Sequence, residues 1–172
     1  DLSIKKKIDN NSIDNKLLKQ IIQDAKSLIE DNYKLFNIIH LIILHSKLDG
    51  KFYDSMPINK VGNDLILEIK FILLPKKIIQ SIKELFKNNH ITINNFYNSS
   101  YLKSLNYIKY FDQYENKVFL DIGYNQTTLI VYKKEKIFFI NSIPIGGINI
   151  TKDISKILNL NLDESEKMKI NL

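Results

Sequence analysis

The chain has 172 residues, a formal net charge of +6 and 44% hydrophobic residues, a composition typical of globular proteins. This length provides a buried core for one compact domain or two small ones. The chain contains no cysteine, which excludes a disulfide scaffold, a thiolate nucleophile and a cysteine-ligated zinc site.

The positive charge comes from lysine alone, since the sequence contains no arginine. Nucleic-acid sites depend on arginine for bidentate contacts to phosphates and bases. The lysine runs at residues 5–7, 76–77 and 133–134 are short and scattered. An AT-rich genome, which favours Lys, Ile and Asn codons, accounts for this composition. We therefore expect no nucleic-acid partner.

The most apolar stretch, residues 35–44, reads LFNIIHLIIL. It has about half the length of a bilayer-spanning helix and contains Asn37 and His40, so it predicts a buried strand. The first residues lack the apolar core of a signal peptide and an initiator Met. We therefore expect an internal fragment of a cytoplasmic protein.

The first half of the chain alternates between strand and helix patterns. Apolar residues at helical spacing predict a helix capped by Ser12, with Asp14 in its first turn, that ends at residues 31–32. Pro75 predicts the first turn of a second helix, which ends at residues 88–89. Strands are predicted for residues 2–8, 34–45, 65–73 and 91–93. This order indicates an α+β module of two layers.

The second half changes character after a polar break at residues 112–116. Residues 99–110, before the break, predict a loosely amphipathic helix. Strands are predicted for residues 118–120, 129–132 and 137–140. Two helices are predicted around residues 151–158 and from about residue 163. Thr151 or Asp153 would cap the first of them.

A polar octet with the sequence DIGYNQTT occupies residues 121–128, between two apolar strands. Consecutive backbone N–H groups in such a tight turn can form an anion-binding nest. Gly123 allows the backbone to approach a phosphate or to adopt positive φ, and Asn125 is the next most tolerant residue for the left-handed region. Thr127 offers a hydroxyl, and Asp121 could hold Mg²⁺ through its water shell. An ordinary β-hairpin with turn-forming Gly and Asn is the alternative.

Gly146 and Gly147 follow the third strand and precede a helix. A glycine pair at a helix N-terminus is a second place where the backbone can approach a nucleotide. The order is strand, polar hairpin, strand, turn, strand, Gly-Gly and helix, which resembles the second half of an actin/Hsp70-type ATPase.

Within that superfamily these segments resemble FtsA, the bacterial cell-division actin homologue. Residues 121–127 are similar to the second phosphate loop, Asp-x-Gly-x-Gly-x-Thr, with Asn125 in the second Gly place. Residues 144–154 follow the FtsA pattern Pro-x-Gly-Gly-x-x-x-Thr-x-Asp-Ile. The resemblance implies the α/β fold of the actin-like ATPases, which is ribonuclease H-like, with an inserted α+β subdomain of the SHS2 type called 1C.

The resemblance also implies a domain organisation. Residues 1–95 would form the 1C subdomain, an interaction module. Residues 96–116 would form the connecting helix that returns the chain to the first ATPase lobe. Residues 117–172 would begin the second ATPase lobe and carry the phosphate-binding hairpin.

The resemblance further implies a site for ATP and Mg²⁺ in the complete protein, with the Mg²⁺ held by Asp121 through water. The implied phosphate-binding residues are Asp121, Gly123, Tyr124, Asn125, Gln126, Thr127, Gly146 and Gly147. No catalytic residue is assigned. The chain lacks the first phosphate loop and the adenine-binding segment of the family, so we expect that it does not hydrolyse ATP by itself.

The implied function is that of a self-assembling scaffold at the division site, on the cytoplasmic face of the inner membrane, that links the FtsZ ring to the membrane. Its partners would be further copies of itself, FtsZ and other division proteins, with membrane contact only through a segment absent from this sequence. One alternative is a PilM-like platform for type IV pilus assembly, which would bind a short peptide of a membrane partner. Another is a non-enzymatic interaction module with a degenerate loop, which Mg-ATP would not stabilise.

The histidines of the chain are His40, His45 and His90. An odd separation on one strand predicts that His40 and His45 point to opposite faces. A metal site needs converging ligands, so we expect structural or surface histidines.

Overall fold

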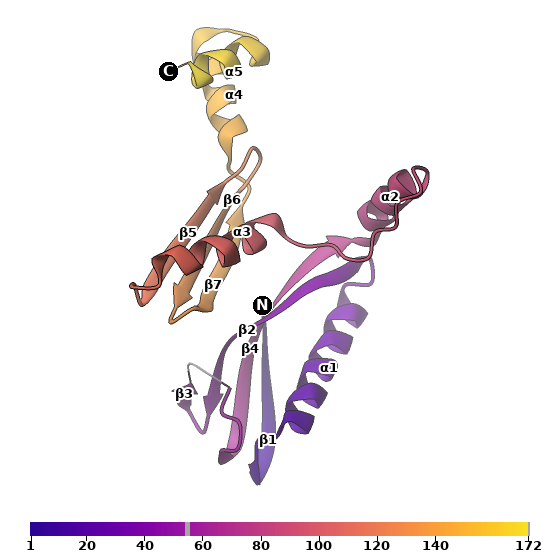
Figure 1. Cartoon of the computed structure of the whole chain (residues 1–172), viewed down its shortest axis with the longest axis vertical. Coiled ribbons are helices and arrows are strands. Elements are labelled where there is room, and N and C mark those ends of the chain that lie inside the picture. Colours follow the sequence, from indigo (N-terminus) through magenta and orange to yellow (C-terminus); the bar gives the residue numbers. More distant parts are fainter. Residues whose placement is uncertain (54–55, 172) are drawn as a thin grey trace. The chain divides into compact units, whose positions relative to one another are not determined.

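The computed structural model describes residues 1–53 and 56–171. It divides the chain into two compact units, Asp1–Leu102 and Lys103–Leu172. Each unit has its own antiparallel sheet, of four strands in the first and three in the second (Figure 1).

The sheet of the first unit is built around its longest strand, β4. The strands are β1 (Leu2–Ser12), β2 (Phe36–Leu48), β3 (Lys51–Tyr53) and β4 (Val61–Pro75), in the spatial order β1-β4-β2-β3. Leu65, Leu67 and Ile69 on β4 are completely buried. They alternate with partly exposed residues, which is the period of a strand that buries one face. The predicted strand at residues 65–73 lies within β4.

Helix α1 (Asn15–Asn32) packs on one face of this sheet and closes the main core (Figure 1). Its buried residues are Leu18, Ile21 and Ala25. The helix is capped by Asp14, whose carboxylate accepts a hydrogen bond from the Leu17 N–H at 2.7 Å. The prediction that Ser12 caps the helix is wrong, because Ser12 is still paired with Val61 in the sheet.

Strand β2 contains two register shifts, between Ile38 and His40 and between Ile43 and His45. Each shift inserts an extra residue and reverses the alternation of faces beyond it. His40 therefore lies opposite Ile72 and His45 opposite Glu68, two positions on one face of β4. Both histidines face away from α1, so the prediction that they point to opposite faces is wrong.

The segment after α2 (Lys76–Lys87) carries no strand in the described structure, so the strand predicted at residues 91–93 is wrong. Instead, the chain turns back just after α2, and the Ile91 N–H donates a hydrogen bond to the Phe86 carbonyl at 3.0 Å. His90 adopts a left-handed conformation there, with φ of 58°. A run of Ile-Thr-Ile forms a strand only where a neighbouring edge offers hydrogen bonds.

The sheet of the second unit consists of β5 (Asn116–Ile122), β6 (Thr127–Lys133) and β7 (Lys136–Ile143), in that order. Helix α3 (Ser99–Tyr107) precedes it and continues as the short 3₁₀ helix η1 (Ile108–Phe111). The buried Ser104 hydroxyl hydrogen-bonds the Tyr132 hydroxyl at 2.5 Å, and the Tyr107 ring stacks on Phe119. These contacts place the second half of α3 on one face of the sheet.

Helices α4 (Gly147–Leu158) and α5 (Leu162–Ile170) form a helical hairpin at the end of the chain. Asn159 turns the chain with φ of 53°, and the Asn161 side chain caps α5. The N-cap of α4 is Gly146. The prediction of Thr151 or Asp153 as the cap is wrong, because the helix already begins at Gly147.

The most apolar stretch of the sequence runs as β2 from Phe36 onwards, so it is a strand as predicted. Of residues 35–44 only Ile42 is buried, so the prediction of a buried strand is wrong. Among the described residues, no helix combines the length and the hydropathy that crossing a bilayer requires. The second face of the β5-β6-β7 sheet is apolar and open, with Val118, Leu120 and Ile122 exposed by 68%, 54% and 65%.

Candidate functional site

The polar octet forms the turn between β5 and β6. Asp121 and Ile122 are the last residues of β5, and Thr127 opens β6 opposite Ile122. The Gly123 N–H donates to the Gln126 carbonyl at 2.8 Å and closes the turn. The residues predicted from the hairpin therefore lie together at one end of the second sheet. Asp121, predicted in the turn, is a strand residue.

The turn contains no left-handed residue, since neither Gly123 nor Asn125 has positive φ. The expected positive φ is therefore wrong for both residues, whereas the approach of a phosphate to the Gly123 backbone stays a prediction. Gly123 is small for another reason, because a Cβ there would lie 3.0 Å from the Gln126 carbonyl oxygen. Among the hydrogen bonds between described backbone groups, none uses the N–H of Tyr124, Asn125 or Gln126. These N–H groups thus have no backbone partner in the described structure, and the Gln126 nitrogen lies against Gly146, where a Cβ would be 2.7 Å from it.

Gly146 and Gly147 pack directly against this turn. The Gly147 N–H donates to the Gly123 carbonyl, and the Ile148 N–H donates to the Tyr124 carbonyl, both at 2.9 Å. A Cβ on Gly146 would lie 2.5 Å from each of the same two carbonyl oxygens. The glycine is therefore required by the close approach of two main-chain segments.

The N–H groups at the start of α4 are consequently bound by carbonyls of the same chain. These groups, which are free donors at most helix starts, bind hairpin carbonyls. The Gly146 N–H donates to the Asn149 side chain at 2.9 Å. The contact of Gly146 and Gly147 with a nucleotide stays a prediction, and the structure gives them a second role in fixing the hairpin.

The Asp121 carboxylate faces a lysine on α3. The Lys103 Nζ lies 3.3 and 3.4 Å from the two carboxylate oxygens, and the Asp121 side chain is 19% exposed. Lys103 could not be found from the sequence, because nothing in it indicates which side of α3 meets β5. The pair shows that a positive charge is accommodated at this carboxylate.

The donor set around Asp121 suits a hydrated magnesium ion. No group of three or more His, Cys, Asp or Glu side chains that could hold a metal occurs among the described residues. Mg²⁺ keeps several of its waters and commonly takes one or two carboxylates. A single aspartate therefore fits the predicted water-mediated contact, and it does not fit a cage made of protein ligands.

Thr127 is engaged with the chain in this structure. Its hydroxyl donates to the Ile145 carbonyl at 2.7 Å. A hydroxyl has one proton to donate, so contact with a phosphate oxygen would require this bond to break. The bond connects the start of β6 to the segment just before Gly146.

A polar cluster that the sequence analysis missed lies beside Gly147. The Lys169 Nζ donates to the Glu166 carboxylate at 2.7 Å, to the Thr151 hydroxyl at 2.9 Å and to the Gly147 carbonyl at 3.3 Å. Thr151, which is 1% exposed, also donates to Glu166. The spacing of Glu166 and Lys169, three residues apart on a helix, was the signal that could have found the pair.

This cluster lowers the pKa of the Glu166 carboxyl. The hydrogen bond from Lys169 is the main cause and the hydrogen bond from Thr151 adds to it, since both favour the charged form. The cluster therefore holds an ionised pair at the point where α5 crosses the start of α4.

His40 has a structural role at the start of α3. Its Nε2 accepts the Asn98 N–H at 2.8 Å, and its ring lies edge-on to Tyr101. Burial lowers the pKa of this imidazole, which favours the neutral form that can accept the bond. The residue thus fixes the start of α3 to the first unit.

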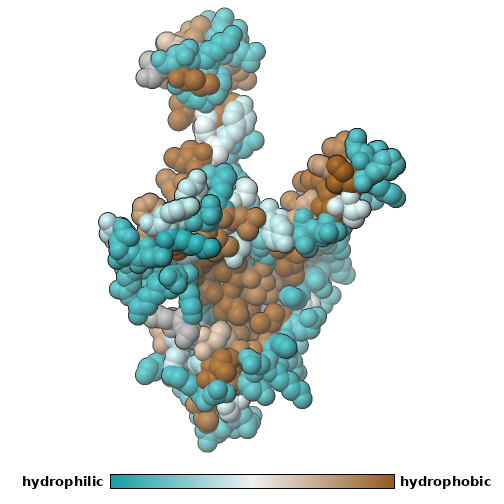
Figure 2. All heavy atoms as spheres, viewed as in Figure 1, coloured by the Kyte–Doolittle hydropathy of each residue, from teal (hydrophilic) through white to brown (hydrophobic). Residues whose placement is uncertain are grey.

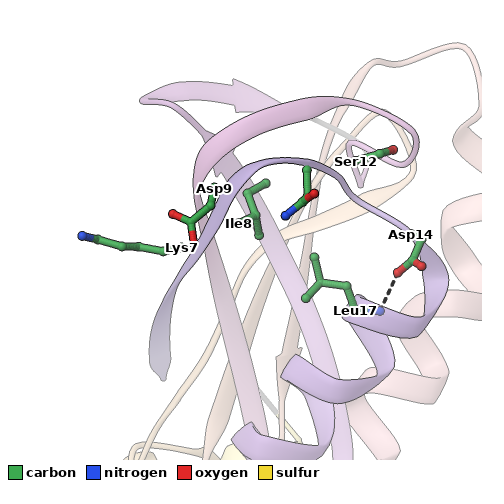
Figure 3. A pocket seen from close by; sticks show the side chains of 7 residues that line it. Lys7, Ile8, Asp9, Ser12, Asp14 and Leu17 are labelled. Atoms are coloured by element: carbon green, nitrogen blue, oxygen red, sulfur yellow. Dashed lines mark hydrogen bonds between the residues drawn. The ribbon is translucent and has the colours of Figure 1, made fainter.

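A separate polar pocket lies in the first unit, where β1 bulges away from β4 (Figure 3). Asp9 and Asn10 have φ of 46° and 61° in this bulge. Figure 3 shows Asp14 turned to the Leu17 backbone. The pocket contains none of the residues predicted for phosphate binding.

Comparison with known proteins supports the resemblance seen in the sequence. A model of the family "Cell division protein FtsA" matches residues 118–172, which include the hairpin and the glycine pair. The chain is 18% identical over 133 residues to cell division protein FtsA of Agrobacterium fabrum, covering 77% of the chain and 30% of that protein. It is 24% identical over 140 residues to FtsA of Helicobacter pylori, covering 81% and 28%. The chain thus spans less than a third of the length of these relatives.

The fold is also found among solved structures. A chain of the PilM-PilN type IV pilus biogenesis complex superposes with a TM-score of 0.60 at 14% identity, covering 97% of this chain and 47% of that one. The predicted α/β class and the actin-like fold are therefore confirmed. The chain resembles the cell division protein FtsA, and it has the fold of part of an actin-like ATPase.

Proposed function

We propose that the chain is part of a nucleotide-binding cell-division scaffold of the FtsA type. The observation that carries the proposal is the pair of backbone hydrogen bonds between the hairpin and the start of α4. These bonds join the two motifs on which the resemblance to FtsA rests, and both motifs lie within the residues that the FtsA family matches.

In this proposal the N–H groups of residues 124–126 bind phosphate oxygens of ATP. Asp121 holds the waters of a Mg²⁺ ion, which would neutralise phosphate charge. Gly123 and Thr127 shape the turn, and Gly146 and Gly147 keep it against α4. A single phosphate-binding segment does not position a nucleotide for transfer, so we propose no hydrolysis by this chain alone.

The first unit would serve assembly. We propose that residues 1–95 form the interaction module, that residues 96–116 connect it to the ATPase lobes, and that residues 117–172 begin the second lobe. The partners would be further copies of the protein, FtsZ and other division proteins, at the cytoplasmic face of the inner membrane.

A PilM-like role is the second candidate. The superposition on the PilM-PilN complex covers nearly the whole chain and supports it. A protein of that kind would bind a partner peptide, whereas an FtsA-like scaffold would self-assemble. Sedimentation of the natural polypeptide that carries this chain, with and without Mg-ATP, separates the two. Deleting residues 1–95 should abolish the self-association, and unchanged self-association would contradict the assembly role.

The nucleotide site is tested by Asp121→Ala in the same polypeptide. A charge-assisted contact contributes about 1.5–3 kcal/mol, so we expect Mg-ATP to bind about 10- to 100-fold more weakly by titration calorimetry. Asp153→Ala is the matched control, because this aspartate is exposed on α4 away from the hairpin.

Equal affinity of the Asp121→Ala variant and the parent would contradict the role of Asp121. A parent that shows no binding and no stabilisation by Mg-ATP would instead identify the hairpin as a degenerate loop in a pure interaction module.

A further inference from the structure

Helix α2 of the first unit has an apolar face that its own sheet leaves largely open. The apolar residues at helical spacing are Ile78, Ile79, Ile82, Leu85 and Phe86. Ile79 is 7% exposed, whereas Ile78 and Leu85 are 46% and 63% exposed. The helix is therefore attached to the sheet through one edge of its apolar face, and the rest of that face meets solvent.

The apolar surface continues beyond both ends of the helix. The Ile91 N–H bonds to the Phe86 carbonyl, and Ile91 is 51% exposed. The Lys76 N–H bonds to the Leu35 carbonyl at 2.9 Å, and Leu35 is 78% exposed. In Figure 2 the region of α2 is hydrophobic along one side and hydrophilic at its outer end.

The polar side of α2 carries one sign of charge. It has Lys76, Lys77, Lys83 and Lys87 against the single Glu84. At 100° per residue, Lys76, Lys83 and Lys87 fall along one border of the apolar face. No ion pair between described residues involves any of the four lysines. The Glu84 carboxylate is bound to Gln80.

We infer that α2 binds an anionic membrane surface. The helix would lie in the plane of the interface, with Ile78, Leu85 and Phe86 among the acyl chains and the bordering lysines at the phosphates. A basic amphipathic helix with a strong separation of faces binds in this way. The inference goes beyond the proposed function, since it gives this chain a lipid contact of its own.

The charge pattern favours lipid over a protein groove. Helices that pair with other helices carry charges of both signs beside the apolar seam, but the border of this face is lysine only. A helix of 12 residues is about 18 Å long and cannot span a bilayer, so the binding is superficial and reversible.

The test uses the 172-residue chain and sedimentation with vesicles of phosphatidylcholine, with or without phosphatidylglycerol. Each lysine near an anionic surface contributes an attraction equivalent to about fivefold in affinity. We expect binding to the anionic vesicles only, weakened by salt. Lys83→Glu with Lys87→Glu should abolish it, and Leu85→Glu should do the same by removing an inserted side chain.

The matched controls are Lys156→Glu and Ile157→Glu on α4, where Ile157 is 79% exposed. They carry the same changes of charge and polarity on another exposed helix and should leave binding unchanged. Circular dichroism confirms that each variant is folded.

Three outcomes would overturn the inference. The first is a parent chain that does not bind anionic vesicles. The second is an equal loss of binding in the α2 and α4 variants. The third is a parent chain that forms a dimer in solution without binding vesicles, where Leu85→Glu dissociates the dimer. None of these outcomes involves nucleotide, so the proposed function is tested separately.

Discussion

Gly146 is the residue at which one added atom would change the hairpin. Its ideal Cβ position lies 2.5 Å from the carbonyl oxygens of Gly123 and Tyr124 and 2.7 Å from the Gln126 nitrogen. Main-chain atoms cannot rotate away as a flexible side chain does. The neighbouring Gly147 is different, because its Cβ would be 3.6 Å from the Lys169 Nζ, which is an ordinary contact.

We therefore expect Gly146→Ala to destabilise the second unit by about 1–3 kcal/mol, the usual cost of forcing an atom into a packed site. Gly147→Ala is the matched control and should cost less. The measurement is urea unfolding combined with hydrogen exchange of the amides of Gly147 and Ile148. Equal stability of the two variants would contradict this account of Gly146.

Single residues were predicted well where the chain itself carries the information. The alternation of apolar residues predicted strand β4, and the helical spacing of apolar residues predicted helices α1 and α2. The cap of α1 was misplaced by two residues because Ser12 and Asp14 both suit the position. The register of Ser12 with Val61, which decides between them, depends on a strand about fifty residues away.

At the scale of elements, α4 and α5 are held together by the Thr151–Glu166–Lys169 cluster. Sequence patterns predicted both helices, but they did not predict which faces meet. The bulges of β2 and the docking of α3 against β5 were missed for the same reason. Each is decided by a partner element, and one sequence does not show which elements are partners.

The cluster makes the stability of the helical hairpin depend on pH. The pKa of Glu166 is lower in the folded chain than in the unfolded chain. Its ionised form therefore stabilises the fold at pH values above the unfolded-state pKa, and this stabilisation is lost as the pH falls through the lower folded-state pKa.

We expect Glu166→Gln to reduce the loss of unfolding free energy between neutral and strongly acidic pH. Denaturant unfolding at a series of pH values, followed by circular dichroism, measures this loss. Asp153→Asn on the exposed side of α4 is the control and should follow the parent. A parallel decline of the parent and the Glu166→Gln variant would show that the cluster does not act through this carboxylate.

At the scale of the whole molecule, the second unit leaves one face of its sheet open. Leu120 lies opposite Leu129 on that face and Val118 lies opposite Val131. Phe139 and Ile143 on β7 belong to the same face and are 41% and 50% exposed. A continuous apolar face of this kind is an aggregation hazard in water.

We expect Leu120→Lys to raise the solubility of the isolated chain and to reduce its binding of a hydrophobic dye, with little change in unfolding free energy. The side chain is 54% exposed, so the charge remains hydrated. Ile130→Lys, at a completely buried position of the adjacent strand, should prevent folding of the unit. Unchanged dye binding in Leu120→Lys would show that this face is not the exposed apolar surface in solution.

The contacts between the hairpin and α4 use main-chain atoms on both sides. The carbonyls of Gly123 and Tyr124 meet the N–H groups of Gly147 and Ile148, and no side chain of residues 124–126 enters these bonds. Mutation can therefore replace Tyr, Asn and Gln at these three positions without moving the turn. The backbone geometry of such a loop can therefore be kept after its sequence motif has changed. We expect distant relatives to be found more readily by structural comparison than by this motif.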